Sequence, residues 1–155
     1  MRTLEGKVAI VTGAGQGVGE GIAVALADAG AAVVASGRTE SKVERTATTI
    51  AERGGTAVAM RCDVTDADDI RACVDRTVAE LGTVDILVNN AQVPPLGPIA
   101  EIPEALFVEG WQTGPLATFR FPRCSSRKPK VPRPSPSRRA FPDFSTNAFM
   151  SKVRS

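Results

Sequence analysis

The sequence predicts an α/β fold built on one parallel sheet, and two observations support this prediction. Short apolar runs alternate, along the first 119 residues, with stretches in which apolar residues recur at helical spacing. Hydrophobic residues make up 43% and charged residues 23% of the 155 positions, which is ordinary for one globular domain. We therefore expect a single doubly wound domain.

The first helix is expected between two buried strands. An apolar run at residues 8–11 predicts a strand that is buried on both faces. Apolar residues then recur at helical spacing over residues 22–29, and Gly30 ends that helix. The run at residues 31–36 predicts the second strand.

The second helix begins beside Thr39 and stops at Gly54, and residues 57–61 form the third strand. Asp66 is placed to cap a third helix, which Gly82 ends. Residues 84–88 are the fourth strand. Right-handed βαβ units give the strand order 3-2-1-4, with a crevice at the carboxyl ends where the order reverses between the first and fourth strands.

The last 36 residues differ sharply from the rest in charge and composition. Residues 1–119 hold nine basic and 16 acidic residues, whereas residues 120–155 hold ten basic residues against Asp143 alone. Six of the 11 prolines and seven serines also fall in this segment. Such a composition buries too little apolar surface to offset the entropy of ordering it. The prediction is a folded domain over 1–119 and a disordered basic tail over 120–155.

Several classes of protein are disfavoured by residue content. The chain has three cysteines without CxxC spacing and no histidine, so neither a disulfide framework nor a zinc site is expected. No apolar run approaches the roughly 18 residues that cross a bilayer, and an acid stands where a signal peptide needs its apolar core. We expect a soluble cytoplasmic protein with no membrane partner and no metal.

A glycine-rich loop joins the first strand to the first helix, and it reads TGAGQGVG over residues 12–19. Glycines let the backbone approach a pyrophosphate, and the helix N-terminus carries partial positive charge. The structural alternative is a tight turn alone. The residues expected to bind the nucleotide here are Gly13, Gly15, Gln16, Gly17, Val18 and Gly19.

The end of the second strand points to the kind of nucleotide. NAD-binding chains usually present a carboxylate there to the ribose hydroxyls, but this chain reads Ser36-Gly37-Arg38. A guanidinium pairs with a 2′-phosphate, so NADP is favoured over NAD. Alternatively, Arg38 is only a solvated residue at the start of a helix. Gln16 adds no second cation to the phosphate site.

Three motifs in order, each at a strand end, resemble those of the short-chain dehydrogenases/reductases. They are the glycine loop, Asp63-Val64 after the third strand, and Asn89-Asn90-Ala91 after the fourth. The resemblance implies a Rossmann-type fold, in which a nicotinamide cofactor exchanges a hydride with a small carbonyl or alcohol in the intact parent. It further implies that Asp63 bonds the adenine amino group beside Val64, that Asn90 and Ala91 line the cofactor ribose, and that Asn89 ties the fourth strand to its neighbour. Gln92 departs from the family's usual glycine.

The resemblance stops short of the family's catalytic residues. Residues 111–120 look like the family's next helix, but Gly114-Pro115 stands where its active-site Asn is usual, and Pro115 is expected to weaken that helix. The family's catalytic Ser and Tyr-x-x-x-Lys have no counterpart, and the sequence contains no Tyr. We therefore expect no catalytic residue, an inactive truncated or frameshifted chain, and loss of the family's oligomer.

The tail permits two further interpretations. A real basic arm would bind nucleic acid or an acidic surface through charge, although it lacks the Tyr and Trp that would stack on bases, which makes nucleic acid an unlikely partner. An intact short protein would bind the nucleotide without turnover. A fourth strand left without a neighbour would also expose an apolar edge.

Overall fold

A computed structural model describes residues 2–125, and the side chains through Arg123. Four strands form one parallel sheet in the order β3-β2-β1-β4, which confirms the predicted topology. Their bounds are β1 Val8–Thr12, β2 Ala32–Gly37, β3 Thr56–Arg61 and β4 Ile86–Val88.

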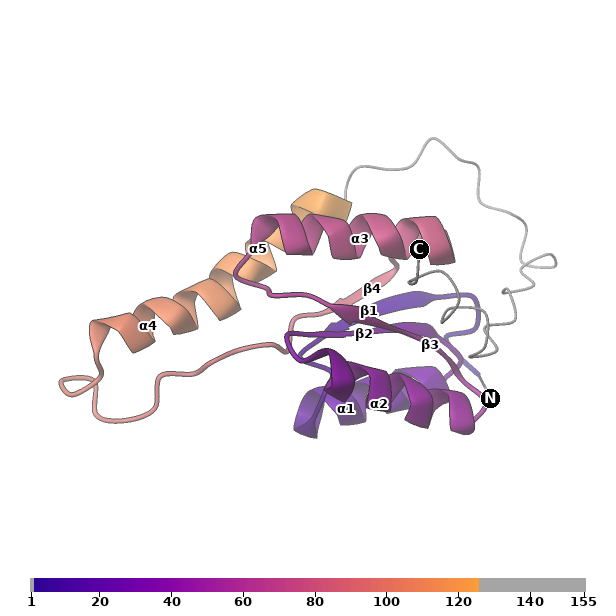
Figure 1. The fold of residues 1–155 in the computed structure, drawn as a ribbon, viewed down its shortest axis with the longest axis horizontal. Coiled ribbons are helices and arrows are strands. Elements are labelled where there is room, and N and C mark those ends of the chain that lie inside the picture. The colour runs from indigo at the N-terminus through magenta and orange to yellow at the C-terminus, as the bar shows by residue number, and fades with distance from the viewer. Residues whose placement is uncertain (1, 126–155) are drawn as a thin grey trace, which may run out of the picture.

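Helices cover both faces of the sheet, as Figure 1 shows: α1 and α2 lie on one face, and α3 and α5 on the other. α4 extends away from the sheet on a long connection from β4. The helices are α1 Gly17–Asp28, α2 Glu40–Glu52, α3 Ala67–Leu81, α4 Glu104–Trp111 and α5 Ala117–Ser125. None of the helices within residues 2–125 combines the length and apolar character that crossing a membrane requires.

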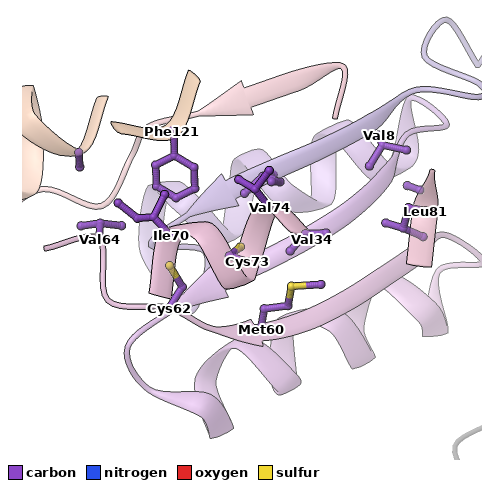
Figure 2. Close-up of a cluster of buried hydrophobic side chains, with 13 residues drawn as sticks. Val8, Val34, Met60, Cys62, Val64, Ile70, Cys73, Val74, Leu81 and Phe121 are labelled. Atoms are coloured by element: carbon purple, nitrogen blue, oxygen red, sulfur yellow. The ribbon is translucent and has the colours of Figure 1, made fainter. Parts of the chain in front are cut away.

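Two hydrophobic clusters, one on each side of the sheet, form the core. Successive strand residues point to opposite faces, so Val8 and Ile10 pack with α3 and α5 while Ala9 and Val11 pack with α1 and α2. Figure 2 shows the first cluster, with Phe121 of α5 pointing toward Ile70 of α3. The sheet is therefore buried on both faces, as the continuous apolar runs predicted.

The predicted ends of α3 are confirmed. The Asp66 carboxylate accepts hydrogen bonds from the backbone N–H groups of Asp68 and Asp69, at 2.7 and 3.3 Å. Gly82 follows the helix with a φ of +84°, a left-handed conformation in which a Cβ is unfavourable. These contacts satisfy backbone groups that the helix itself leaves unpaired.

The helical run crosses residue 119, where the folded domain was expected to end: it extends from α4 through a π-helical turn, η1 Gln112–Leu116, into α5. Pro115 lies inside this turn, and the wider turn accommodates a residue that donates no hydrogen bond. Two residues assigned to the tail belong to the fold. Phe121 is 1% exposed, and Arg120 donates a 2.6 Å hydrogen bond to the Thr65 carbonyl. α5 continues to Ser125, and residues 126–155 of the expected tail lie outside the described residues.

Candidate nucleotide-binding site

A cleft of about 360 Å³ opens at the carboxyl ends of the strands, at the reversal of strand order between β1 and β4. Its size falls within the range of small-molecule sites. Segments far apart in the sequence form its wall: the glycine loop, the start of α2, and the residues that follow β3 and β4. The lining residues are Gly13, Gly15, Gln16, Val18, Gly19, Gly37, Arg38, Thr39, Lys42, Val43, Cys62, Asp63, Val64, Asn90, Ala91, Gln92, Val93 and Thr113.

The structure brings together the residues singled out in the sequence. All those expected to bind the nucleotide line the cleft except Gly17, which begins α1 directly beside it; Asn89, for which a structural role was expected, does not line it. The parallel strands explain this convergence, because their carboxyl ends meet at one edge of the sheet and each motif follows a strand.

Several positions of the glycine loop require glycine, for two different reasons that Gly17 and Gly19 illustrate. Gly17 has a φ of +57°, and a Cβ built on it meets no atom within 4 Å, so its surroundings are open. A Cβ on Gly19 would instead collide with the Gly13 carbonyl oxygen. The first turn of α1 therefore packs directly on the loop, beside the cleft.

Thr12, which the sequence reading did not single out, joins β1 to the segment after β4. Its buried hydroxyl donates to the Val88 carbonyl at 3.2 Å and accepts from the N–H groups of Asn90 and Ala91, both at 3.0 Å. The Asn90 side chain donates to the Thr12 carbonyl at 3.0 Å. Asn90, rather than the exposed Asn89, therefore ties the fourth strand to its neighbour, and the role expected for Asn89 is wrong.

Replacing Thr12 by Val should lower the free energy of unfolding by about 1–3 kcal/mol, because the nearly isosteric side chain leaves buried N–H groups unpaired. Urea unfolding followed by circular dichroism measures the change. Thr12→Ser, which keeps the hydroxyl, is the control and should lose clearly less. A loss in Thr12→Ser as large as that in Thr12→Val would contradict this reason, because removing the methyl group alone would then cost as much as removing the hydroxyl.

Asp63 presents an ionised carboxylate in the cleft. Partial burial acts to raise the pKa of Asp63, but hydrogen bonds from the Thr65 N–H and hydroxyl, with help from Arg38 and Arg61, outweigh it and hold the pKa below its usual value. Both Thr65 bonds, at 2.9 and 2.8 Å, are accepted by Oδ1. The carboxylate is thus a fixed acceptor at neutral pH, suited to an exocyclic amino group.

Cys62, directly before Asp63, also lines the cleft but is 1% exposed. Hydrogen bonding with the neighbouring Cys73 thiol, together with burial, raises the pKa of the Cys62 thiol. The thiol therefore remains protonated and packs as an apolar group, so no nucleophilic cysteine is assigned to this wall.

The far wall of the cleft is formed by the segment after Ala91 and by the π-helical turn. Thr113 accepts a hydrogen bond from the Val93 N–H at 3.0 Å and donates one to the Glu109 carbonyl at 2.9 Å. The Gln92 side chain lies against Gly114, where an added Cβ would come within 3.2 Å of the Gln92 amide nitrogen. An amide side chain from residue 92 thus occupies the space that a side chain at 114 would need.

A basic residue that the sequence analysis did not single out, Lys42, also lines the cleft. Lys42, in the first turn of α2, lines the cleft with Arg38, and its ammonium donates to Gln16 Oε1 at 2.6 Å. Lys42 follows Arg38 by four residues, and α2 begins between them, so the sequence could have indicated that the two lie near each other. Only the fold shows that both line one cleft.

Comparisons with known proteins agree with this geometry. A family model described as short chain dehydrogenase matches residues 7–123. The 7α-hydroxysteroid dehydrogenase of Escherichia coli (strain K12) is 47% identical over 88 residues, which is 57% of this chain and 34% of that protein. L-Fucose dehydrogenase of Oryctolagus cuniculus is 42% identical over 115 residues, 74% of this chain and 39% of that protein.

Solved structures are similar over the same part. A dehydrogenase/reductase from Sinorhizobium meliloti 1021 is 38% identical with a TM-score of 0.76, covering 82% of this chain and 51% of that one. A 7α-hydroxysteroid dehydrogenase solved with NADH and 7-oxo-glycochenodeoxycholic acid is 37% identical with a TM-score of 0.74, covering 81% and 49%. The chain thus spans about half the length of the solved structures that it matches.

Proposed function

The chain belongs to the short-chain dehydrogenase family, and from that premise we propose that residues 2–125 bind a nicotinamide dinucleotide and prefer NADP. The observation that carries the proposal is the convergence of the glycine loop, Asp63 and Arg38 on one cleft at the reversal of strand order. When bound, the nicotinamide supplies or accepts a hydride.

The residues present fit such a group. The open space at Gly17 and the first turn of α1 suit a pyrophosphate, the Asp63 carboxylate suits the adenine amino group, and the cleft is of adequate volume. Asn90 and Ala91 would line the ribose from the β4 side, where Thr12 holds their backbone. These roles make the cleft a binding site that the chain's own residues hold in shape.

The preference for NADP rests on the charge beside β2. The strand and the residue after it read Ser36-Gly37-Arg38, so no carboxylate there would repel a 2′-phosphate. The Arg38 guanidinium lines the cleft and could pair with that phosphate. Arg38 is exposed and forms no ion pair within residues 2–125, so its charge is available to a ligand.

Arg38→Asp should reverse the preference. We expect NADP⁺ to bind at least about tenfold more weakly, because a charge-assisted contact is replaced by repulsion, whereas NAD⁺ affinity stays equal or rises. Titration calorimetry with both dinucleotides on the full chain measures this. Equal affinities for NAD⁺ and NADP⁺ in the unmutated chain would contradict the proposal, and Arg71→Asp on the outer face of α3 is the control.

We further propose that this chain binds without turnover. The sequence contains no tyrosine, whereas the family's mechanism uses Tyr as its acid and base, and Gly114-Pro115 stands where the family's Asn is usual. Carbonyl reduction and alcohol oxidation then belong to family members that carry those residues. A nucleotide-binding protein without catalysis is the function that this set of residues supports.

A further inference from the structure

Resting on the proposed function, we propose that Lys42 is a second specificity-determining cation for the 2′-phosphate of the coenzyme, held ready by the Gln16 side chain. Arg38 alone was the candidate from the sequence, and position 16 offered no charge. The fold supplies the missing cation from α2.

The contact between Lys42 and Gln16 bridges two separate segments of the cleft wall. The Lys42 ammonium donates to Gln16 Oε1 at 2.6 Å, and both side chains are exposed and line the same cleft as Arg38. Because the amide is neutral, it orients the ammonium over the glycine loop without cancelling its charge.

Arg38 and Lys42 differ from neighbouring basic residues in forming no close ion pair within residues 2–125, although the charge of Arg38 helps to lower the pKa of Asp63. Arg45, one turn further along α2, pairs with Glu20, and Arg61 of β3 pairs with Asp69. Within the described part of the chain, neither Arg38 nor Lys42 forms an ion pair. Two unpaired cations on one cleft wall indicate an anionic ligand rather than a network that stabilises the fold.

The backbone of α2 is held against the glycine loop, which sets the position of Lys42. A Cβ on Gly15 would come within 2.8 Å of the Lys42 Cβ, so only glycine permits this close approach. The buried Thr46 hydroxyl donates to the Ala14 carbonyl at 2.8 Å, and Arg45 donates to the Gly15 carbonyl at 3.2 Å. The backbone of Lys42 is therefore held in place beside the glycine loop, and only the Lys42 side chain needs to move to contact a phosphate.

An exposed lysine with no role in binding is the alternative, and nucleotide fragments distinguish the two. 2′,5′-ADP carries the 2′-phosphate and 5′-AMP does not, so only the affinity for 2′,5′-ADP should depend on Lys42. We expect Lys42→Gln to weaken 2′,5′-ADP binding to the full chain about tenfold at low salt and to leave 5′-AMP binding unchanged. Lys42→Arg should retain most of the affinity.

Gln16→Glu tests the same site without removing a cation. The nearly isosteric carboxylate would pair with Lys42 and repel the phosphate, so 2′,5′-ADP should again bind about tenfold more weakly. Lys7→Gln is the matched control, because it removes one lysine charge at the opposite, amino end of β1, where Lys7 lies 3.9 Å from Asp85. Its affinity for 2′,5′-ADP should equal that of the unmutated chain.

The outcomes separate this inference from the proposed function. If Lys42→Gln and Gln16→Glu bind 2′,5′-ADP as tightly as the control while 5′-AMP still binds, the role of Lys42 is overturned and nucleotide binding stands. If the folded, unmutated chain binds neither fragment, both proposals are overturned. Loss confined to 2′,5′-ADP, with weaker salt dependence in Lys42→Gln, supports the inference.

Discussion

The purified chain is expected to show no hydride transfer between NADPH and any carbonyl, or between NADP⁺ and any alcohol. A positioned acid or base typically contributes about 10²- to 10⁴-fold, and the chain has neither the Tyr that the family uses for this role nor a His. The π-helical turn at Gln112–Leu116 adds no replacement, because Gly114 carries no side chain and Pro115 has no N–H group.

Absorbance at 340 nm with a panel of carbonyl substrates is the measurement, and it should show only the background rate. Binding of the dinucleotide should be verified in the same sample, so that inactivity is not confused with an empty site. A steady rate that needs substrate and disappears in Gly13→Ala or Gly17→Ala would contradict the prediction, because both positions have a positive φ that alanine resists.

Phe121→Ala is expected to lower the free energy of unfolding by about 3–5 kcal/mol. The ring is 1% exposed, and it packs in the cluster that α3 and α5 form with one face of the sheet (Figure 2). Truncating a large buried aromatic side chain loses its transfer free energy and leaves a cavity. Urea unfolding monitored by circular dichroism gives the change in free energy.

Phe119→Ala on the same helix is the matched control. Its ring is 58% exposed and lies 4.9 Å from the Arg123 guanidinium, so its loss should cost less than about 1 kcal/mol. Equal, small effects of the two substitutions would mean that α5 is not part of the cooperative core. The folded part would then end near residue 119, as the composition suggested.

The fold was largely predictable because its signals are local. Apolar runs and helical periodicity give the strands and the helices through α3, while Asp66 and Gly82 mark the ends of α3 by backbone chemistry that needs no distant partner. The strand order followed from the handedness of βαβ units, which leaves few alternatives. Phe121 was missed because a run of Arg, Pro and Ser begins beside it, and composition averages over a single buried ring.

The candidate site, like the fold, was predictable from the sequence only in part. The sequence by itself determined that the glycine loop, Arg38 and Asp63 follow strands, and parallel pairing then brings strand ends to one edge. Only the tertiary structure decided which side chains from different segments meet: the Thr12 hydroxyl with the backbone after β4, and Lys42 with Gln16. These contacts join residues 78 and 26 positions apart. Such partners are selected by the packing of elements on one another, and no local pattern of residues encodes them.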